Sequence, residues 1–264
     1  MKALLFISTI SIIFLNACGI RSTSEEETSG GPTQQMSQAI KRDKAETVRT
    51  NISMRAGTLV VRGGAENLVD TEISSNREEW KPEIEYTLNG RTGRLRIEQP
   101  ESEGINFNIN DDFVNNWNIQ LNNDITQDLD VKIGAGETDL DLRGLQLNSI
   151  DIDAGVGEHN MNLANTSVPQ IRLNAGVGEI SVDLTGQWDN DLEAEFNGGI
   201  GELNLILPNE AGIRMEVTGA IGSINAPGLD KDGRVYTNNN YRSGGHVMEL
   251  EVKAGIGQVN VSLE

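Results

Sequence analysis

The sequence has little of the residues that build compact catalytic and metal sites. Its 264 residues include one cysteine and two histidines. A disulfide within the chain is therefore excluded, as is a zinc site made from several cysteines. So few histidines also leave little material for acid–base catalysis.

Proline and aromatic residues are scarce, whereas glycine is abundant. There are six prolines, 29 glycines and only 4% aromatic residues. A hydrophobic fraction of 37% with so few rings is thin for one large globular core. It favours an elongated fold with many turns and a narrow aliphatic core.

Positive charge is also in short supply. The chain has 21 Lys and Arg against 40 Asp and Glu, a formal net charge of −19. Such a chain repels polyphosphate, so no nucleic-acid partner is predicted. The charge indicates either a soluble surface or one that receives a cation or a basic partner.

The N-terminus is typical of a cleaved lipoprotein signal. Lys2 precedes an apolar run from Ala3 to Leu15, which is short for a transmembrane helix. Residues 15–18, Leu-Asn-Ala-Cys, resemble a bacterial lipobox, so residues 1–17 are predicted to be a signal peptide and Cys18 to be lipidated. An ordinary cleaved signal beside an incidental cysteine is the alternative. Several acyl chains on Cys18 would anchor the chain at a membrane.

The residues after Cys18 predict a tether and a location. Residues 18–50 are expected to be a flexible acidic tether, because residues 21–35 are rich in Ser, Glu, Gly and Pro. Gly19, in place of an aspartate, favours the bacterial outer membrane. Residues 24–27, Ser-Glu-Glu-Glu, resemble acidic surface-export signals, so both periplasmic and surface exposure are kept.

A repeat of about 21 residues predicts the fold. Segments such as 151–163 (DIDAGVGEHNMNL) and 172–184 (RLNAGVGEISVDL) align on a Gly-x-Gly pair followed by alternating apolar residues. The second glycines of the copies are Gly136, Gly157, Gly178, Gly201, Gly222 and Gly257. Residues 53–63 are a faint earlier copy. This period predicts an all-β, single-chain parallel β-solenoid, with an irregular β cap in 51–128 and coils in 129–264.

The alternation assigns side-chain directions. Ile180, Val182 and Leu184 are expected to point inward, with Ser181 outward. In the same column as Ile180, His159 is expected to be partly buried and hydrogen-bonded. The second glycines are predicted to be critical for the fold, because a strand that turns a corner needs positive φ or a bulge there.

A glutamate follows the second glycine in four copies. Stacked at one rung spacing, Glu137, Glu158, Glu179 and Glu202 would repel each other. Solvated side chains are the simpler interpretation, and a calcium ion bridging two rungs is the alternative. No other cofactor or metal is predicted, and a phosphate loop is excluded because Lys-Ser/Thr does not follow the glycines.

An excursion at 226–246 interrupts the last interval of the repeat. It is rich in Gly, Asn and Asp and contains Tyr236 and Tyr241. A cap over the open end of the solenoid is one interpretation. A loop that presents these tyrosines to a partner is the other. Residues 36–48 are expected to be helical or the end of the tether.

Taken together, these features resemble the bacterial toast-rack family. The resemblance rests on segments 56–73, 82–100, 117–121, 128–158 and 224–233. That family includes the C-terminal domains of cell-wall-active antibiotic response proteins and related adhesin-like β-solenoids. The resemblance implies an envelope location and a part in envelope-stress sensing or assembly, and it brings no catalytic residues. This chain differs from the response proteins in its expected lipid anchor.

The function expected from the sequence is therefore non-enzymatic. A lipid-anchored scaffold or interaction protein of the cell envelope, with a protein partner, is the first hypothesis. An adhesin-like or glycan-binding surface protein is the alternative, which aromatic platforms for sugars would favour. Trp80, Trp117 and Trp188 recur at no fixed rung position, and no small-molecule substrate is evident.

Overall fold

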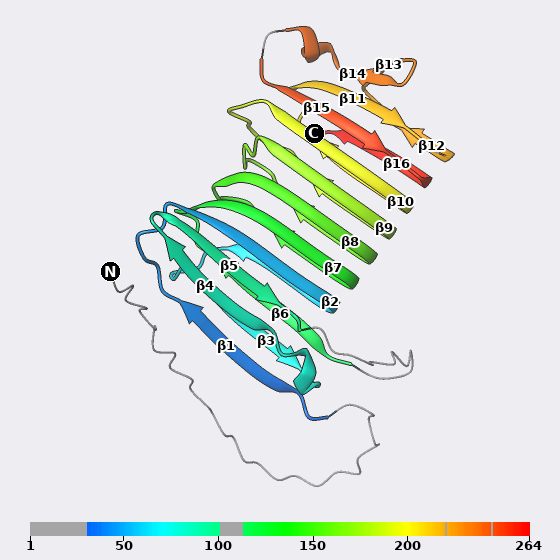
Figure 1. The fold of residues 1–264 in the computed structure, drawn as a ribbon. Helices are drawn as coiled ribbons and strands as arrows, with labels where there is room; N and C mark the ends of the chain where they lie inside the picture. Colours follow the sequence, from blue (N-terminus) through cyan, green and yellow to red (C-terminus); the bar gives the residue numbers. More distant parts are fainter. Residues whose placement is uncertain (1–30, 101–112, 220, 244) are drawn as a thin grey trace.

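The computed structural model describes residues 31–100, 113–219, 221–243 and 245–264 (Figure 1). Within these residues the regular secondary structure is nearly all β. The strands are β1 (Gln34–Ile40), β2 (Thr47–Gly63), β3 (Val69–Ser75), β4 (Glu83–Asn89), β5 (Thr92–Glu98), β6 (Asn115–Leu121), β7 (Thr126–Asp141), β8 (Leu147–Asn162), β9 (Gln170–Asp183), β10 (Leu192–Leu207), β11 (Gly212–Thr218), β12 (Ile221–Asn225), β13 (Asp230–Asp232), β14 (Val235–Thr237), β15 (Val247–Lys253) and β16 (Ile256–Leu263). Two short 3-10 helices are η1 (Glu78–Trp80) and η2 (Asn239–Arg242).

Long parallel strands form the body of the molecule. Strands β2, β7, β8, β9 and β10 stack side by side in that order, one strand per rung. Their register aligns the repeats, because Gly136 pairs with Gly157, and Gly157 with Gly178. The predicted parallel β-solenoid is confirmed.

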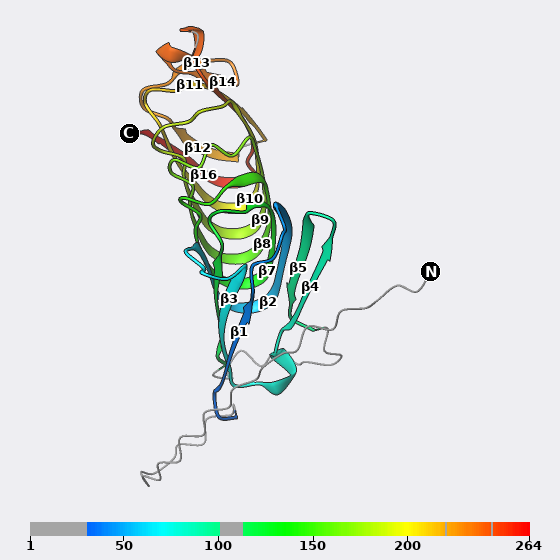
Figure 2. The same ribbon diagram turned by 90° about the vertical axis from the view of Figure 1, so that its left-hand side faces the viewer.

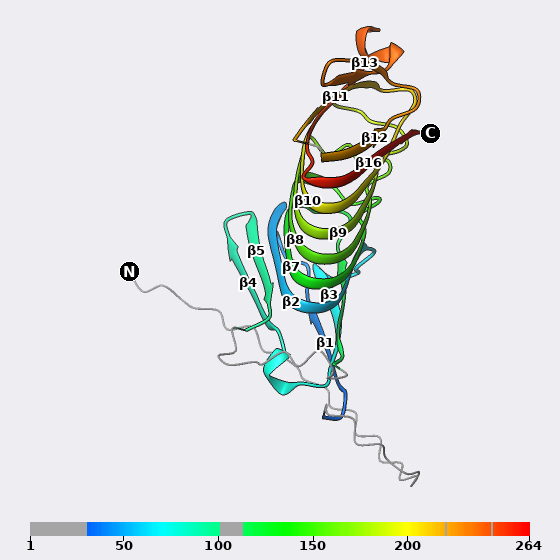
Figure 3. The ribbon, with the colours of Figure 1, turned by 90° about the vertical axis from the view of Figure 1, so that its right-hand side faces the viewer.

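Each long strand bends at its glycine pair, so the sheet folds around the core (Figures 2 and 3). Among the described strands, the sheet does not close on itself. Turns return the chain from one rung to the next, and backbone hydrogen bonds connect the turns of neighbouring rungs. The Leu163 N–H donates to the Asp183 carbonyl at 2.8 Å, and the Leu184 N–H donates to the Ile206 carbonyl. The coil is therefore completed by turns rather than by a further strand.

The core follows the predicted alternation. Ile180, Val182 and Leu184 are buried, as are Leu203, Leu205 and Leu207 on the next rung. Ser181 between them is partly exposed. Since each rung covers its neighbour's apolar side chains, stability is distributed along the stack rather than concentrated in one centre.

The N-terminal end is built from shorter strands on both halves of β2. β2 itself is a full rung, with Ala56 opposite Ala135 and Gly57 opposite Gly136, which confirms the faint copy at 53–63. Beyond it, β5 pairs with the first half of β2 and β6 with the second half. β4 then pairs with β5, while β3 and β1 continue from β6, so the sheet divides into two ribbons (Figure 1).

Asn115 closes the corner at this end. Its side-chain amide donates to the Ala56 carbonyl at 2.7 Å, and its carbonyl oxygen accepts from the Trp117 indole at 2.9 Å. Trp117 is 1% exposed. A buried polar residue thus replaces the glycine pair that a further rung would have supplied.

Two boundaries expected from the sequence are wrong. Residues 36–48 are neither helical nor tether, because β1 ends at Ile40 and β2 begins at Thr47. Met36 and Ile40 lie against the core, and residues 34–40 form an edge strand that pairs antiparallel with β3. The first strand of the described residues therefore begins at Gln34 rather than at 51, and the regular rungs begin before 129. The expected strand at 105–110 lies outside the described residues.

The order of the last rungs also differs from the order of the repeats in sequence. β15 and β16 lie between β10 on one side and β11 and β12 on the other. The Gly255 N–H donates to the Gly198 carbonyl, and the Gly255 carbonyl accepts from the Ile221 N–H at 2.8 Å. The final copy of the repeat is thus inserted between the fourth and fifth copies, and the fifth becomes the outermost rung.

Candidate interaction surface

The corner glycines combine two restrictions on the backbone. At Gly57, Gly136, Gly157, Gly178, Gly201, Gly222 and Gly257, φ lies between +130° and +155°. Residues other than glycine rarely adopt these φ values, because their Cβ atoms clash with the backbone. The neighbouring rung adds a steric limit, because a Cβ on Gly178 would lie 1.8 Å from the Gly157 carbonyl oxygen. The geometry assigns these glycines to a corner of the fold; that the fold depends on them stays a prediction.

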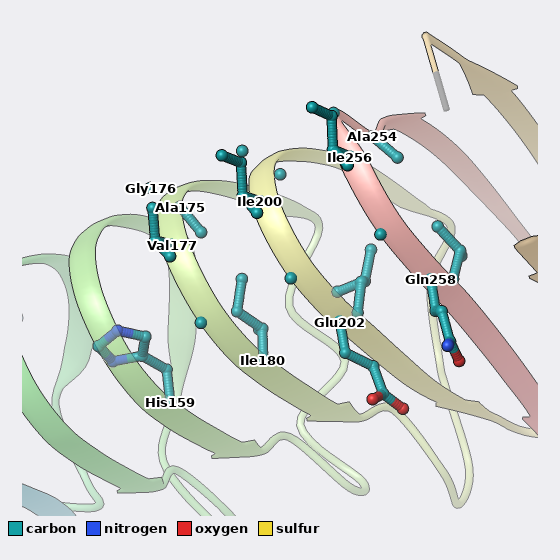
Figure 4. Close-up of a pocket in the computed structure, with 18 residues that line it drawn as sticks. His159, Ala175, Gly176, Val177, Ile180, Ile200, Glu202, Ala254, Ile256 and Gln258 are labelled. Carbon is teal, nitrogen blue, oxygen red and sulfur yellow. The ribbon is translucent and has the colours of Figure 1, made fainter. Parts of the chain in front are cut away.

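The residue between the paired glycines protrudes from this corner. Val156, Val177, Ile200, Ile256 and Ile221 are 54, 45, 53, 54 and 68% exposed. They stand opposite one another on five successive rungs. Among the described residues, only Phe113 is a comparably exposed large hydrophobic side chain. We call the five residues the aliphatic ridge, and Figure 4 shows three of them in a row.

A row of carboxylates runs beside the ridge. Glu137, Glu158, Glu179 and Glu202 pair with one another on successive rungs, and we call them the glutamate row. Within the described chain, none of the four makes an ion pair within 4 Å. Asparagines of the next outward column donate to three of them: Asn160 to Glu158 at 3.2 Å, Asn204 to Glu179 at 3.0 Å and Asn260 to Glu202 at 2.6 Å.

The predicted calcium site gains no further ligands from the fold. In the described residues, no group of three or more His, Cys, Asp or Glu side chains is placed to hold a metal ion. Three of the four glutamates already accept from asparagine amides. A cation bridging the glutamate row stays a prediction from the sequence.

The strand halves that precede the corner carry acidic side chains that form ion pairs, unlike the glutamate row. Lys253 Nζ lies 2.7 Å from Glu195 and 3.1 Å from Glu251, and Arg214 pairs with Glu216 and Glu249. The hydrogen bond from Lys253 lowers the pKa of the Glu195 carboxyl. A shallow groove crosses this face between β8 and β11. Its carboxylates are largely matched by cations of the same chain, unlike those of the glutamate row.

His159 is buried in the column that Thr138 and Ile180 continue. It is 2% exposed, and its Nδ1 lies 3.1 Å from the Thr138 hydroxyl. Its Nε2 has no hydrogen-bond partner in the described part of the chain. The side chain lines a narrow hollow under the corner (Figure 4). Burial lowers the pKa of the His159 imidazole, and Glu158 opposes this shift. The prediction of a buried, hydrogen-bonded histidine agrees with this position.

His159 should make the folded state sensitive to mild acid. An unfolded histidine has a pKa near 6.5, and that of folded His159 is lower, so the unfolded state binds more protons between the two values. Stability is therefore expected to fall as the pH drops below about 6.5. His159→Leu should flatten this part of the curve of unfolding free energy against pH, measured by urea titration. The exposed His246, changed to Leu, is the control; an unchanged slope in His159→Leu would refute the assignment.

The excursion at 226–246 forms a cap over the outermost rung. β14 pairs antiparallel with β11, and β13 pairs with β14 (Figure 1). Tyr236 is 5% exposed and packs in the core, so it is not available to a partner as one interpretation of the sequence required. Tyr241 is partly buried, and its hydroxyl donates to Glu249 at 3.3 Å. A partner role for Tyr241 stays a prediction.

The tryptophans offer no platform for sugar rings. Trp80, Trp117 and Trp188 are 1, 1 and 7% exposed. Cys18 and the signal peptide lie outside the described residues, so their assignment stays a prediction. No helix in the described ranges is long and apolar enough to cross a membrane.

Sequence reasoning missed the exposure of the ridge. The Gly-x-Gly repeat places Val156, Val177 and Ile200 between glycines, but it was not interpreted as forming a surface. The signal was present, since Val177 has the same parity as Glu179 and should point outward with it. Apolar residues are usually assigned to the core, and this bias hid the row.

Comparisons with known proteins place the chain in one family. The family model described as the N-terminal domain of toast_rack, DUF2154, matches residues 29–174 and 151–206, about two thirds of the chain. No curated protein matches. A solved structure of a candidate cell adhesion protein from Clostridium sporogenes ATCC 15579 is 26% identical, with a TM-score of 0.67. The match covers 88% of this chain and 100% of that protein.

A second solved structure is more distant. It is a candidate adhesin from Bacteroides fragilis NCTC 9343, 13% identical, with a TM-score of 0.34. The match covers 88% of this chain and 97% of that one. This likeness is too weak to support an inference about function.

Proposed function

Because this chain belongs to the family of the toast_rack N-terminal domain, we propose that it is a non-enzymatic, adhesin-like interaction protein of the cell envelope. The observation that carries the proposal is the aliphatic ridge, a row of exposed aliphatic side chains at the same position of five stacked strands. Monomeric proteins rarely leave such a contiguous apolar row uncovered unless it meets a partner. The likeness of 88% of this chain to a candidate cell adhesion protein supports the same conclusion.

The side chains of the described region support a binding role rather than catalysis. His159 is buried against Thr138, and His246 lies 3.6 Å from the Asp191 carboxylate on the surface. Neither imidazole is hydrogen-bonded to a serine, so a Ser-His-Asp arrangement is not formed in the described residues. The remaining carboxylates lie on open, polar faces rather than in an apolar pocket.

We further propose that Cys18 is lipidated and holds the protein at the bacterial outer membrane. Full-length protein expressed with its own signal should be recovered in the membrane fraction, labelled by an alkyne fatty acid. Cys18→Ser should lose the label and move to the soluble fraction. Ser22→Ala, in the expected tether close to Cys18, is the control and should behave as the parent. Membrane recovery of Cys18→Ser would contradict the anchor.

Surface exposure and adhesion can be tested in the same cells. Protease added to intact cells should remove the folded region if it faces outward, and spare it if it faces the periplasm. Cells that display the protein should bind immobilised envelope material more strongly than cells with Cys18→Ser. Equal binding by the two would refute the adhesin-like function.

Two narrower roles remain within this proposal. A part in the response to cell-wall antibiotics is suggested by the family resemblance alone; survival under such antibiotics, with and without the protein, tests it. A glycan partner is the alternative to a protein partner. The buried tryptophans disfavour it, and periodate treatment of the immobilised envelope would abolish binding only if the partner is a glycan.

A further inference from the structure

We propose that the aliphatic ridge and the glutamate row together bind an extended, proline-rich segment of a partner protein that carries lysine or arginine at every third position. The proposal rests on the interaction role proposed above and names the chemistry of the partner. It follows from the geometry of two parallel rows, one apolar and one acidic.

The two rows run side by side along the axis of the stack. Val177 and Glu179 are separated by one residue on the same strand, so both point outward and lie about 6.6 Å apart along it. The same pair recurs as Val156 and Glu158 on β8 and as Ile200 and Glu202 on β10. Figure 4 shows Ile200 and Ile256 in one row, and Glu202 and Gln258 in the next, so the acidic row ends at β10 while the ridge continues.

The spacing of the rungs selects the conformation of the partner. Two rungs span about 9.6 Å, since neighbouring strands lie about 4.8 Å apart. A polyproline II helix repeats a face every three residues, or about 9.3 Å. A β-strand repeats a face every two residues, about 6.7 Å, which matches neither one rung nor two. A polyproline II segment therefore keeps its register with every second rung over the whole ridge.

The chemistry of the rows selects the side chains of the partner. Polyproline II has three faces, so one can lie on the ridge, a second can face the glutamate row and the third can face water. The glutamate row has no cation of its own within 4 Å among the described residues, which leaves its charge open to an incoming lysine or arginine. Such side chains can also lay their aliphatic stems on the ridge.

Charge also separates this partner from the other occupants of an apolar row. An anionic membrane surface would be repelled by Glu158, Glu179 and Glu202, which lie beside the ridge. A second copy packed ridge to ridge in the opposite direction would bring two glutamate rows together. The five rungs from Val156 to Ile221 span about 19 Å, which corresponds to about six residues of polyproline II.

The test is a titration of the full-length protein in detergent with a labelled twelve-residue peptide of four Pro-Val-Lys repeats. We expect saturable binding. Two comparison peptides, with Pro-Val-Glu or Pro-Ser-Lys repeats, should bind at least tenfold more weakly. Binding of Pro-Ser-Lys equal to that of Pro-Val-Lys would overturn the role of the ridge.

Variants of the protein separate the two rows. Val177→Ser with Ile200→Ser and Ile256→Ser should weaken the Pro-Val-Lys peptide at least tenfold. Glu158→Gln with Glu179→Gln and Glu202→Gln should do the same and should also remove the dependence of binding on salt. All of these side chains are at least partly exposed, so the folds should stay intact by circular dichroism.

The control removes charge from the strand halves before the corner. Glu193→Gln with Glu251→Gln removes two negative charges there and should leave peptide binding within twofold. Equal weakening by this control would overturn the proposal, since it would indicate non-specific attraction. Binding of the Cys18→Ser protein, which lacks the proposed lipid, to vesicles of phosphatidylglycerol without binding to the peptide would overturn it too. Neither result bears on membrane anchoring or cell adhesion, which are measured in cells.

Discussion

Gly201→Ala is expected to lower the free energy of unfolding by about 4 kcal/mol or to prevent folding. Gly201 has φ +144°, and a Cβ there would lie 1.8 Å from the Gly178 carbonyl oxygen. The side chain cannot be accommodated by a rotamer change, because the obstacle is the backbone of the adjacent rung. Relief requires the two rungs to separate, and that breaks their ladder of hydrogen bonds.

The matched control lies three residues earlier on the same strand. A Cβ on Gly198 would have no heavy atom within 4 Å. The residue opposite Gly198 on β9 is Ala175, which already carries a Cβ. Gly198→Ala should therefore be neutral or should stabilise by about 0.5 kcal/mol, through lower entropy of the unfolded chain. Urea denaturation of both variants measures the difference. Similar destabilisation by the two would contradict the steric explanation for the second glycine.

Val252→Asn is expected to have the second largest effect, and it tests the order of the rungs. Val252 is completely buried on β15, opposite Phe196 of β10 and Val217 of β11. Burying an amide without partners costs about 1–3 kcal/mol, to which lost packing adds. Since β15 connects β10 to β11, its loosening should release β11 and the cap formed by β13 and β14.

Hydrogen exchange can detect this coupling. In Val252→Asn, amides of β11 and β14 should lose protection together with those of β15, while β7 and β8 keep theirs, because stability in stacked repeats is carried by neighbours. Glu251→Asn, exposed on the same strand, should change little. If β11 kept its protection, β11 would instead pair directly with β10, which is the order of these repeats in the sequence.

The inward and outward positions on each strand and the glycine corners could be predicted from the sequence, because the same pattern recurs in every repeat. The parity of Ile180, Val182 and Leu184 follows from the two-residue period of a strand, and parallel stacking aligns that parity on every rung. The glycine corner follows from the same alignment. The structure adds a second property of the corner, because the residue between the two glycines is exposed there. The corner is therefore also the candidate binding surface.

The candidate site could be predicted only in part. The glutamate row was identified, since it occupies one position of the repeat, but it was considered for a cation rather than for a basic partner beside an apolar row. Whether a valine between two glycines points into the core or into solvent depends on the direction of the bend, which a period of 21 residues does not specify. Tyr236 was considered as a surface residue because β14 is too short to give a strand signal.

The sequence by itself determined the class of fold, the strand parity and the positions of the corners, because these depend on contacts repeated at a fixed interval. It also determined the acidic character of the surface. Only the tertiary structure decided which rungs are neighbours. β15 and β16 are inserted between β10 and β11, yet the sequence pattern of each repeat is compatible with either order. Every rung has the same glycine corner and the same aliphatic face, so each can stack on any other. The resulting continuity of Ile200, Ile256 and Ile221 along one ridge is therefore a property of the assembled stack.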